Sequence, residues 1–132
     1  MELDRIDRKI IACLMADATL PLVRLAEAVG LSQTPCWKRV RRLTETGIIR
    51  ARVALVDPER IGLGLTVFVG IVATEQTAAW LAKFEQVVAD LPEIMEAYQL
   101  AGRDDYVIRI VARDMADYDR VRDQIVSALP AR

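Results

Sequence analysis

Residues 29–43 read Val-Gly-Leu-Ser-Gln-Thr-Pro-Cys-Trp-Lys-Arg-Val-Arg-Arg-Leu, and this stretch decides the fold of the N-terminal part. Gly30 suits the position just past the end of a helix. Ser32 is a good N-cap for the helix that follows. Apolar residues then recur at helical spacing and form one stripe. The members of that stripe are Cys36, Val40 and Leu43. The stretch therefore predicts two helices joined by a tight turn.

Further elements flank this stretch on both sides. Apolar residues recur at helical spacing over about 3–16, and again over about eight residues after Pro21, which suits a first helical position. Gly47 ends the later helix. Apolar and basic residues then alternate over 49–55 and predict a strand. Three helices followed by such a strand predict a winged helix-turn-helix.

Basic residues concentrate in the N-terminal part of a chain whose net charge is −1. Residues 1–56 carry 10 Lys+Arg against 6 Asp+Glu, whereas residues 57–132 carry 8 against 13. Six of the basic residues fall within 37–52, together with one acid, Glu45. Such a patch indicates a polyanion partner or, alternatively, a solvated helix face. Its place on the second helix of a helix-turn-helix favours DNA.

The remainder of the chain changes its pattern and predicts a second, sheet-containing domain. The expected elements are a strand over 65–73, a helix over about 76–91, strands over 95–101 and 106–112, and a helix over about 114–129. Gly102-Arg103-Asp104-Asp105, between the last two strands, is typical of a β-hairpin turn. The order β-α-β-β-α is a ferredoxin-like unit without its final strand. We therefore expect an α+β protein.

Composition excludes several classes of function. The chain has no histidine and two cysteines, which removes histidine-based catalysis and histidine zinc sites. No apolar run approaches the roughly 18 residues that span a membrane. Residues 1–5 include acids where a signal peptide needs a basic start. We expect a cytoplasmic protein that is not an enzyme and has no metal, no cofactor and no membrane partner.

Three stretches resemble the Lrp/AsnC family of bacterial and archaeal transcription regulators. They are Leu3-Asp4-Arg5-Ile6-Asp7-Arg8, residues 29–43 followed by Gly47-Ile48-Ile49, and Gly102-Arg103-Asp104-Asp105-Tyr106, which resembles the Gly-x-x-Asp-Tyr loop of the family's effector domain. The Trp-Lys-Arg run at 37–39 and residues 57–65 are most similar to the branch that regulates cysteine breakdown.

The resemblance implies three parts of the chain. Residues 1–50 form a helix-turn-helix DNA-binding domain, 51–63 a strand and hinge linker, and 64–132 an effector-binding and oligomerisation domain. Family members usually continue for about one more strand, which lines part of the effector pocket. Here the sequence stops where that strand would begin, so either the sequence is a piece of a longer chain or the protein lacks the strand. If the protein truly lacks this strand, we expect its neighbouring strand to be an unpaired edge.

The expected DNA contacts lie on the outward side of the third helix and just beyond it. They are Ser32, Gln33, Thr34, Trp37, Lys38, Arg41, Arg42, Arg50 and Arg52. Gln33 suits adenine, and Arg41 or Lys38 suits guanine. The last three arginines suit phosphates; alternatively, some of these arginines pair with local carboxylates. Trp37 either stacks on a sugar or a thymine methyl, or packs against the first helix. Arg39 lies nearer the apolar edge and suits an internal brace.

The resemblance also places an amino-acid effector near the 102–106 loop, although a simple hairpin turn explains the same residues. The expected contacts are Tyr98, Leu100, Gly102, Arg103, Asp104, Asp105 and Tyr106. Backbone N–H groups of Gly102–Asp104 suit the ligand carboxylate, and Asp105 suits its ammonium. Tyr98 and Tyr106 are expected to form a wall.

Together these features predict a sequence-specific regulator that responds to a small amino acid. Its partners are a near-palindromic double-stranded DNA operator and copies of itself, as a homodimer that assembles to a tetramer or octamer. The alternative is a ligand-binding or oligomerisation module without productive DNA binding.

Overall fold

The computed structural model describes residues 2–129 and divides into two compact units. The boundary lies between Leu55 and Val56, inside the predicted linker at 51–63. Each unit has its own hydrophobic core, and each is described by itself.

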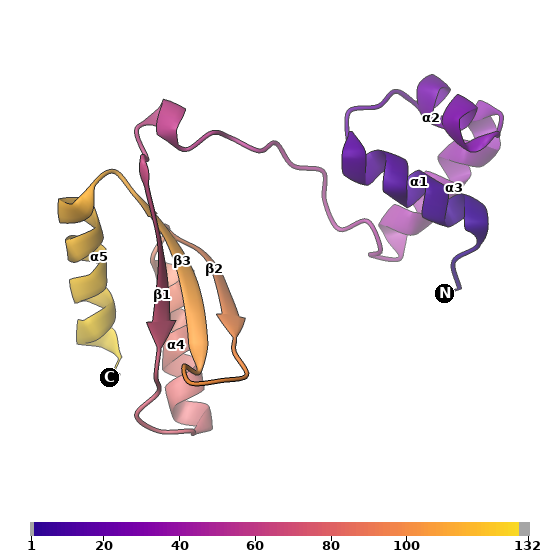
Figure 1. Ribbon diagram of the computed structural model, residues 1–132. Coiled ribbons are helices and arrows are strands. Elements are labelled where there is room, and N and C mark those ends of the chain that lie inside the picture. Colours follow the sequence, from indigo (N-terminus) through magenta and orange to yellow (C-terminus); the bar gives the residue numbers. More distant parts are fainter. Residues whose placement is uncertain (1, 130–132) are drawn as a thin grey trace. The chain divides into compact units, whose positions relative to one another are not determined.

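The first unit is a bundle of three helices. These are α1 (Arg5–Ala16), α2 (Leu22–Val29) and α3 (Gln33–Glu45), as Figure 1 shows. Each lies within two residues of its predicted range. Their apolar stripes meet in a core whose most buried members are Ile10, Leu25, Cys36 and Leu43. The predicted helix-turn-helix is therefore confirmed.

Local chemistry explains where these helices begin and end. Asp4 and Asp7 form a capping box at the start of α1, each carboxylate accepting from the backbone N–H of the other residue. Gly30 ends α2 with φ +77°, a left-handed conformation that favours glycine, and so allows the tight turn into α3. Pro21 is the N-cap of α2 and precedes its first helical residue by one position. Ser32 is at the N-cap of α3, but its side chain makes no capping bond.

The predicted strand over 49–55 is wrong. No strand is assigned at these residues, and the Leu55 side chain is 96% exposed. A strand needs hydrogen-bonded pairing with a neighbour, and the sheet in the described residues is built from other segments. Alternation of apolar and basic residues does not supply that pairing. Within residues 2–129 the helix-turn-helix therefore has no wing.

The second unit follows the predicted β-α-β-β-α order. Its elements are a short 3-10 turn (Glu59–Ile61), β1 (Leu65–Ile71), α4 (Ala78–Asp90), β2 (Ile94–Gln99), β3 (Tyr106–Ala112) and α5 (Met115–Ala128). The strands form an antiparallel sheet in the order β1–β3–β2. Residues 130–132, where the expected further strand would begin, lie outside the described residues.

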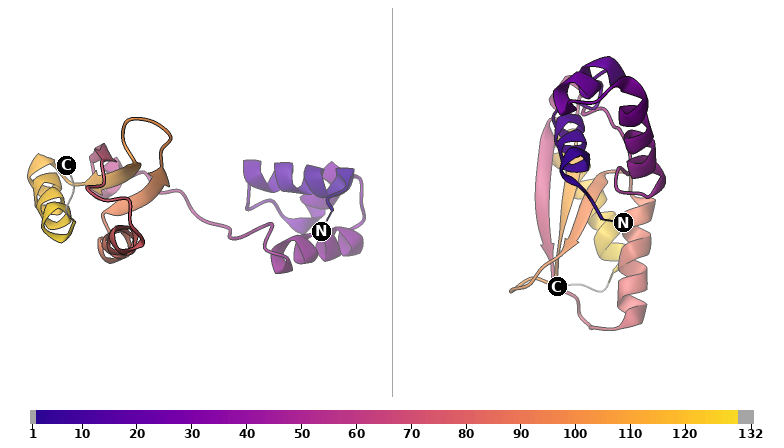
Figure 2. Two further views of the ribbon diagram at one scale, coloured as in Figure 1. Left: turned by 90° about the horizontal axis from the view of Figure 1, so that it is seen from below. Right: turned by 90° about the vertical axis from the view of Figure 1, so that its right-hand side faces the viewer.

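Both long helices of this unit lie on the same face of the sheet, as the views in Figure 2 show. Alternate strand residues and one face of each helix form the core, including Trp80, Phe84, Ile108, Ile110 and Val121. The residues between them point to the other face, which no described element of this unit covers. Phe68 lies there and is 68% exposed. Among the helices described, none is long and apolar enough to cross a membrane.

Candidate nucleic-acid interface and effector site

The outward face of α3 carries the polar residues that the sequence singled out. Ser32, Gln33, Thr34, Trp37, Lys38 and Arg41 are all exposed. The opposite side of the helix is anchored by the buried side chains of Cys36 and Leu43. Burial raises the pKa of the Cys36 thiol, which keeps it protonated and suits a packing role. The helix therefore presents one polar and basic face to solvent on a fixed support.

A buried carboxylate ties α3 to α1. Asp7 is 1% exposed, and its two oxygens accept from Arg39 Nη1 at 3.1 Å and from Arg42 Nη2 at 2.8 Å. Arg39 Nη1 also donates to Asp4 at 2.6 Å, and this hydrogen bond is the main cause of the lowered pKa of Asp4. Arg39 is therefore the internal brace that its position in the helix predicts.

Arg42 is predicted to contact a DNA phosphate, but in the structure it pairs with a carboxylate of the protein itself. Its guanidinium is held by Asp7, although its side chain remains 48% exposed. This is the alternative in which an arginine pairs with a local carboxylate. A phosphate contact from Arg42 has to use the donors that Asp7 leaves free.

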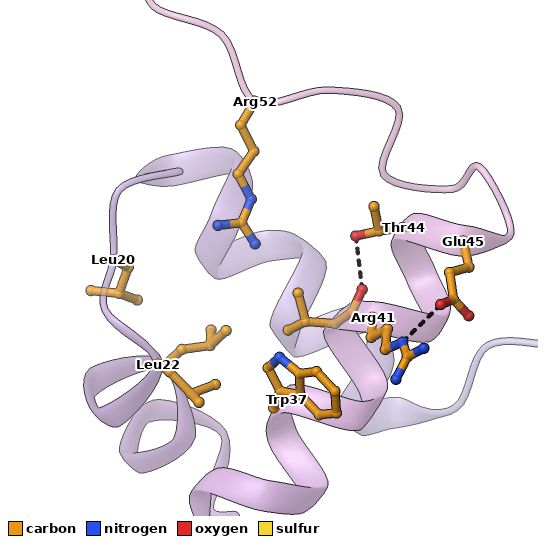
Figure 3. Close-up of a pocket in the computed structure, with 9 residues that line it drawn as sticks. Leu20, Leu22, Trp37, Arg41, Thr44, Glu45 and Arg52 are labelled. Atoms are coloured by element: carbon orange, nitrogen blue, oxygen red, sulfur yellow. Dashed lines mark hydrogen bonds and ion pairs between the residues drawn. The ribbon is translucent and has the colours of Figure 1, made fainter.

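Trp37 shares a groove with residues of α2 and of the turn before it, and no residue of α1 lines that groove. It borders a groove of about 490 Å³ together with Leu20, Leu22 and Leu25 (Figure 3). Trp37 is 47% exposed, so part of the residue remains accessible from solvent. The Arg41 guanidinium carbon lies 5.3 Å from the ring centroid. Of the two predicted settings of Trp37, packing against the first helix finds no support in this groove, and contact with a DNA sugar or thymine methyl stays a prediction.

The basic residues beyond α3 lie in extended chain. Arg50 and Arg52 are exposed, and Figure 3 shows the Arg52 side chain pointing into the groove beside Trp37. Among residues 2–129 no ion pair is assigned to Arg50, Arg52 or Lys38, whereas Arg39, Arg41 and Arg42 are each paired. The unpaired cations are the ones best placed to meet external phosphates without first breaking an internal contact.

The loop between β2 and β3 is fastened to the end of β1. The Asp105 N–H donates to the Ile71 carbonyl at 2.9 Å, and the Asp105 carboxylate accepts from the Ala73 N–H at 2.8 Å. Asp104 lies over Gly70, where an added Cβ would come within 2.9 Å of the Asp104 carboxyl carbon. The predicted ammonium acceptor, Asp105, therefore already has one backbone partner, and Gly70 leaves the space that the Asp104 carboxyl group occupies.

Two predicted effector contacts, Tyr98 and Tyr106, do not form one wall. Tyr106 stacks on Trp80 and tilts against Phe84 on the helix-covered face, with centroids 5.6 and 4.7 Å apart. The Tyr98 hydroxyl instead donates to Glu96 at 3.1 Å, which raises the pKa of that hydroxyl. In the β2–β3 register Tyr98 pairs with Val107, the residue after Tyr106. Because neighbouring residues of a strand point to opposite faces of a sheet, Tyr98 and Tyr106 lie on opposite faces. Both residues nevertheless border a groove of about 370 Å³ beside α4.

The other predicted effector residues lie around the same loop. Gly102 and Arg103 are exposed at its tip, and Leu100 is exposed where its N–H donates to the Asp105 carbonyl at 2.8 Å. Two side chains that shape the candidate sites, Glu45 and Asp7, are not among the residues predicted from the sequence. The four-residue spacing of Arg41 and Glu45 on one helix is a signal that could have revealed Glu45. The bracing role of Asp7 has no comparable signal, because its arginine partners lie 32 and 35 residues away.

Comparison with known proteins identifies both units. Residues 3–44 match the model of the AsnC-type helix-turn-helix domain, and residues 66–131 match the Lrp/AsnC ligand binding domain. The chain is 47% identical, over 97% of its length and 84% of the relative, to the DNA-binding transcriptional activator DecR of Escherichia coli K12. It is 44% identical, over 96% of its length and 77% of the relative, to the glutamate uptake regulatory protein of Zymomonas mobilis.

Solved structures agree with this assignment. An AsnC family transcriptional regulator from Agrobacterium tumefaciens is 42% identical and aligns with TM-score 0.91 over 98% of this chain and 85% of that one. A transcriptional regulator from Neisseria meningitidis, solved as a complex with L-methionine, is 29% identical with TM-score 0.90 over 98% of this chain and 84% of that one. These relatives are transcription regulators, which agrees with the expectation of a protein that is not an enzyme. The chain is a DNA-binding transcription regulator with a small-molecule effector domain, and it belongs to the Lrp/AsnC family.

Proposed function

We propose that this regulator binds a near-palindromic operator as a homodimer and that a small amino acid controls its binding. The observation that carries the proposal is the exposed face of α3, which is held from behind by the buried Asp7 carboxylate. A recognition helix must keep a fixed orientation to read base edges in the major groove. The brace supplies that orientation, because it ties the middle of α3 to α1.

The proposed base contacts come from the exposed face of α3. Gln33 suits adenine, while Lys38 and Arg41 suit guanine. Ser32, Thr34 and Trp37 lie on the same exposed side. Arg50 and Arg52 suit phosphates, and each phosphate contact contributes about 0.9 to the salt slope of binding. Arg42 is a weaker phosphate candidate, since Asp7 holds part of its guanidinium.

The open face of the sheet supports a homodimer. Phe68 is opposite Arg109 in the β1–β3 register, and Arg109 donates to Glu96 at 2.9 Å. This hydrogen bond is the main cause of the lowered pKa of Glu96. The face thus combines an exposed aromatic ring with a paired charge, a composition that suits a protein interface. A second copy would cover Phe68, and two such dimers suit a tetramer or, with further copies, an octamer.

The proposed effector site is the loop between β2 and β3, with the exposed backbone N–H groups of Gly102–Asp104 facing a ligand carboxylate. Asp105 has a second carboxylate oxygen for an ammonium group, besides the one bonded to Ala73. The Neisseria relative is described with L-methionine, and the sequence is most similar to the branch concerned with cysteine breakdown. L-Cysteine and L-methionine are therefore the first ligands to test. An effector acts on DNA binding when it prefers one assembly over another.

Selection of binding sites from random duplex DNA tests the operator. The proposal predicts enrichment of a near-palindrome whose half-sites are about 10 base pairs apart, or a multiple of that spacing. Enrichment of an asymmetric site, or of no sequence at all, would contradict it. Repeating the selection with L-cysteine and with L-methionine tests whether the effector changes the selected spacing.

A further inference from the structure

The Arg41 side chain is held from two sides in the DNA-free protein. Its Nε–H donates to Glu45 Oε1 at 2.8 Å, and its guanidinium lies 5.3 Å from the Trp37 ring centroid. Figure 3 shows Trp37, Arg41 and Glu45 along one side of α3. Because Nε is occupied, the pair of terminal Nη groups is the part of the fork left for an external acceptor pair. Guanine presents such a pair, O6 and N7, in the major groove.

We propose that Glu45 and Trp37 are positioning residues that fix Arg41 as an end-on fork for guanine, so that Glu45 determines base specificity. This inference rests on the proposed function, since it requires α3 to lie in the major groove. Glu45 is then an acid on the DNA-facing side of the reading helix that improves discrimination at some cost in affinity.

The other cations of α3 are not equivalent to Arg41. Arg39 and Arg42 are directed to Asp7 on the side of α1. Lys38 has no assigned ion pair among the described residues, and its ammonium group is a point charge without a planar fork. Arg41 therefore combines a bidentate donor set with a fixed orientation on the exposed side of α3.

Glu45 has two effects on DNA binding that can be measured separately: its charge repels phosphates, and its hydrogen bond orients Arg41. A carboxylate close to DNA repels the phosphates of every sequence equally, so by itself it lowers affinity without changing preference. Orientation of Arg41 acts at one base pair. Exposed ion pairs and exposed cation–π contacts are individually weak, so their combined orienting effect corresponds to about a two- to fivefold preference.

The experiment starts by locating the base that Arg41 reads. Binding sites are selected with the wild-type protein and with Arg41→Ala, and the expected result is a guanine preference that the variant lacks. Two operator duplexes are then made that differ at that one pair, G·C against A·T. Their dissociation constants are measured by fluorescence anisotropy for the wild type, Glu45→Gln and Glu27→Gln. Glu27 is an exposed acid of α2 with no ion pair assigned in the described chain, so its variant controls for the lost charge.

The proposal predicts that Glu45→Gln lowers the G·C preference about two- to fivefold, while Glu27→Gln preserves it. In an Arg41→Ala background, Glu45→Gln should cause no further loss, because the residue it positions is gone. The proposal is overturned if Glu45→Gln changes both affinities by one factor, if the loss persists without Arg41, or if Arg41→Ala keeps the guanine preference. A wild type that binds its selected operator and a scrambled duplex equally would instead overturn the proposed function, and this inference with it.

Discussion

Replacing Asp7 by Asn tests the brace between α1 and α3 most sharply. The change keeps the size of the side chain and one of its oxygens, but it removes the charge that two guanidinium groups share. Three donors converge on the Asp7 carboxylate, namely Arg39, Arg42 and the Asp4 N–H. One retained oxygen can serve two of them, so the new amide N–H₂ group faces the third donor.

The cost follows from the burial of the pair. Removing one partner from a fully buried ion pair costs about 3–5 kcal/mol, whereas an exposed pair contributes about 0–1 kcal/mol. Asp7 is 1% exposed, but both arginines reach solvent and can be rehydrated. The expected loss is therefore intermediate, about 2 kcal/mol. For a unit of this size, in which the urea dependence is about 1 kcal/mol per molar, the unfolding midpoint should fall by roughly 2 M.

Urea unfolding followed by Trp37 fluorescence measures this loss. A Trp80→Phe background leaves Trp37 as the single tryptophan of the chain, so the signal reports the first unit. Asp4→Asn is the matched control, because Asp4 is exposed and Asn is an equally good N-cap. Its midpoint should change less than that of Asp7→Asn. Equal midpoints for Asp7→Asn and the wild type, or a larger shift for Asp4→Asn, would refute the idea that the buried carboxylate holds α3.

Three further predictions concern the second unit. Phe68→Asp should convert the proposed homodimer to monomer in sedimentation equilibrium, and an unchanged mass would exclude the open sheet face as the interface. Gly70→Val should displace the Asp104 carboxyl group from its place over β1 and weaken effector binding in calorimetry, and unchanged affinity would separate the Asp104 side chain from the effector site. Hydrogen bonds from the Arg113 backbone and side chain, with Arg120, lower the pKa of Asp117 to about 2, below its ordinary 3.8. The stability that Asp117 contributes is therefore present above pH 4 and is lost as the pH falls towards 2; Asp117→Asn should flatten acid unfolding in that range, and an unchanged profile would refute this assignment.

Local patterns in the sequence were enough for most of the fold. The strand over 106–112 is as predicted, and the helices begin and end within a residue or two of their expected positions. Periodicity and capping residues determine these elements locally. The strand over 49–55 failed because a strand depends on a partner, and alternation does not reveal whether one exists.

The candidate site was predictable in its residues more than in its contacts. The exposed face of α3 and the bracing role of Arg39 follow from helical geometry alone. The link from Asp7 to Arg42 does not follow from helical geometry, because it joins residues far apart in the chain. The separation of Tyr98 from Tyr106 does not follow from it either. That separation depends on which face of a strand turns towards the helices. Both are properties of packing, which a single sequence leaves open.

Affinity for the protein's own upstream DNA, measured against a scrambled duplex with and without single amino acids, tests the central claim most directly. The salt dependence of binding is recorded for both duplexes, since the phosphate contribution is common to them. The account predicts tighter binding to the upstream DNA and a change in that affinity with one amino acid. Equal and weak binding to both duplexes, unaffected by every amino acid, would contradict it.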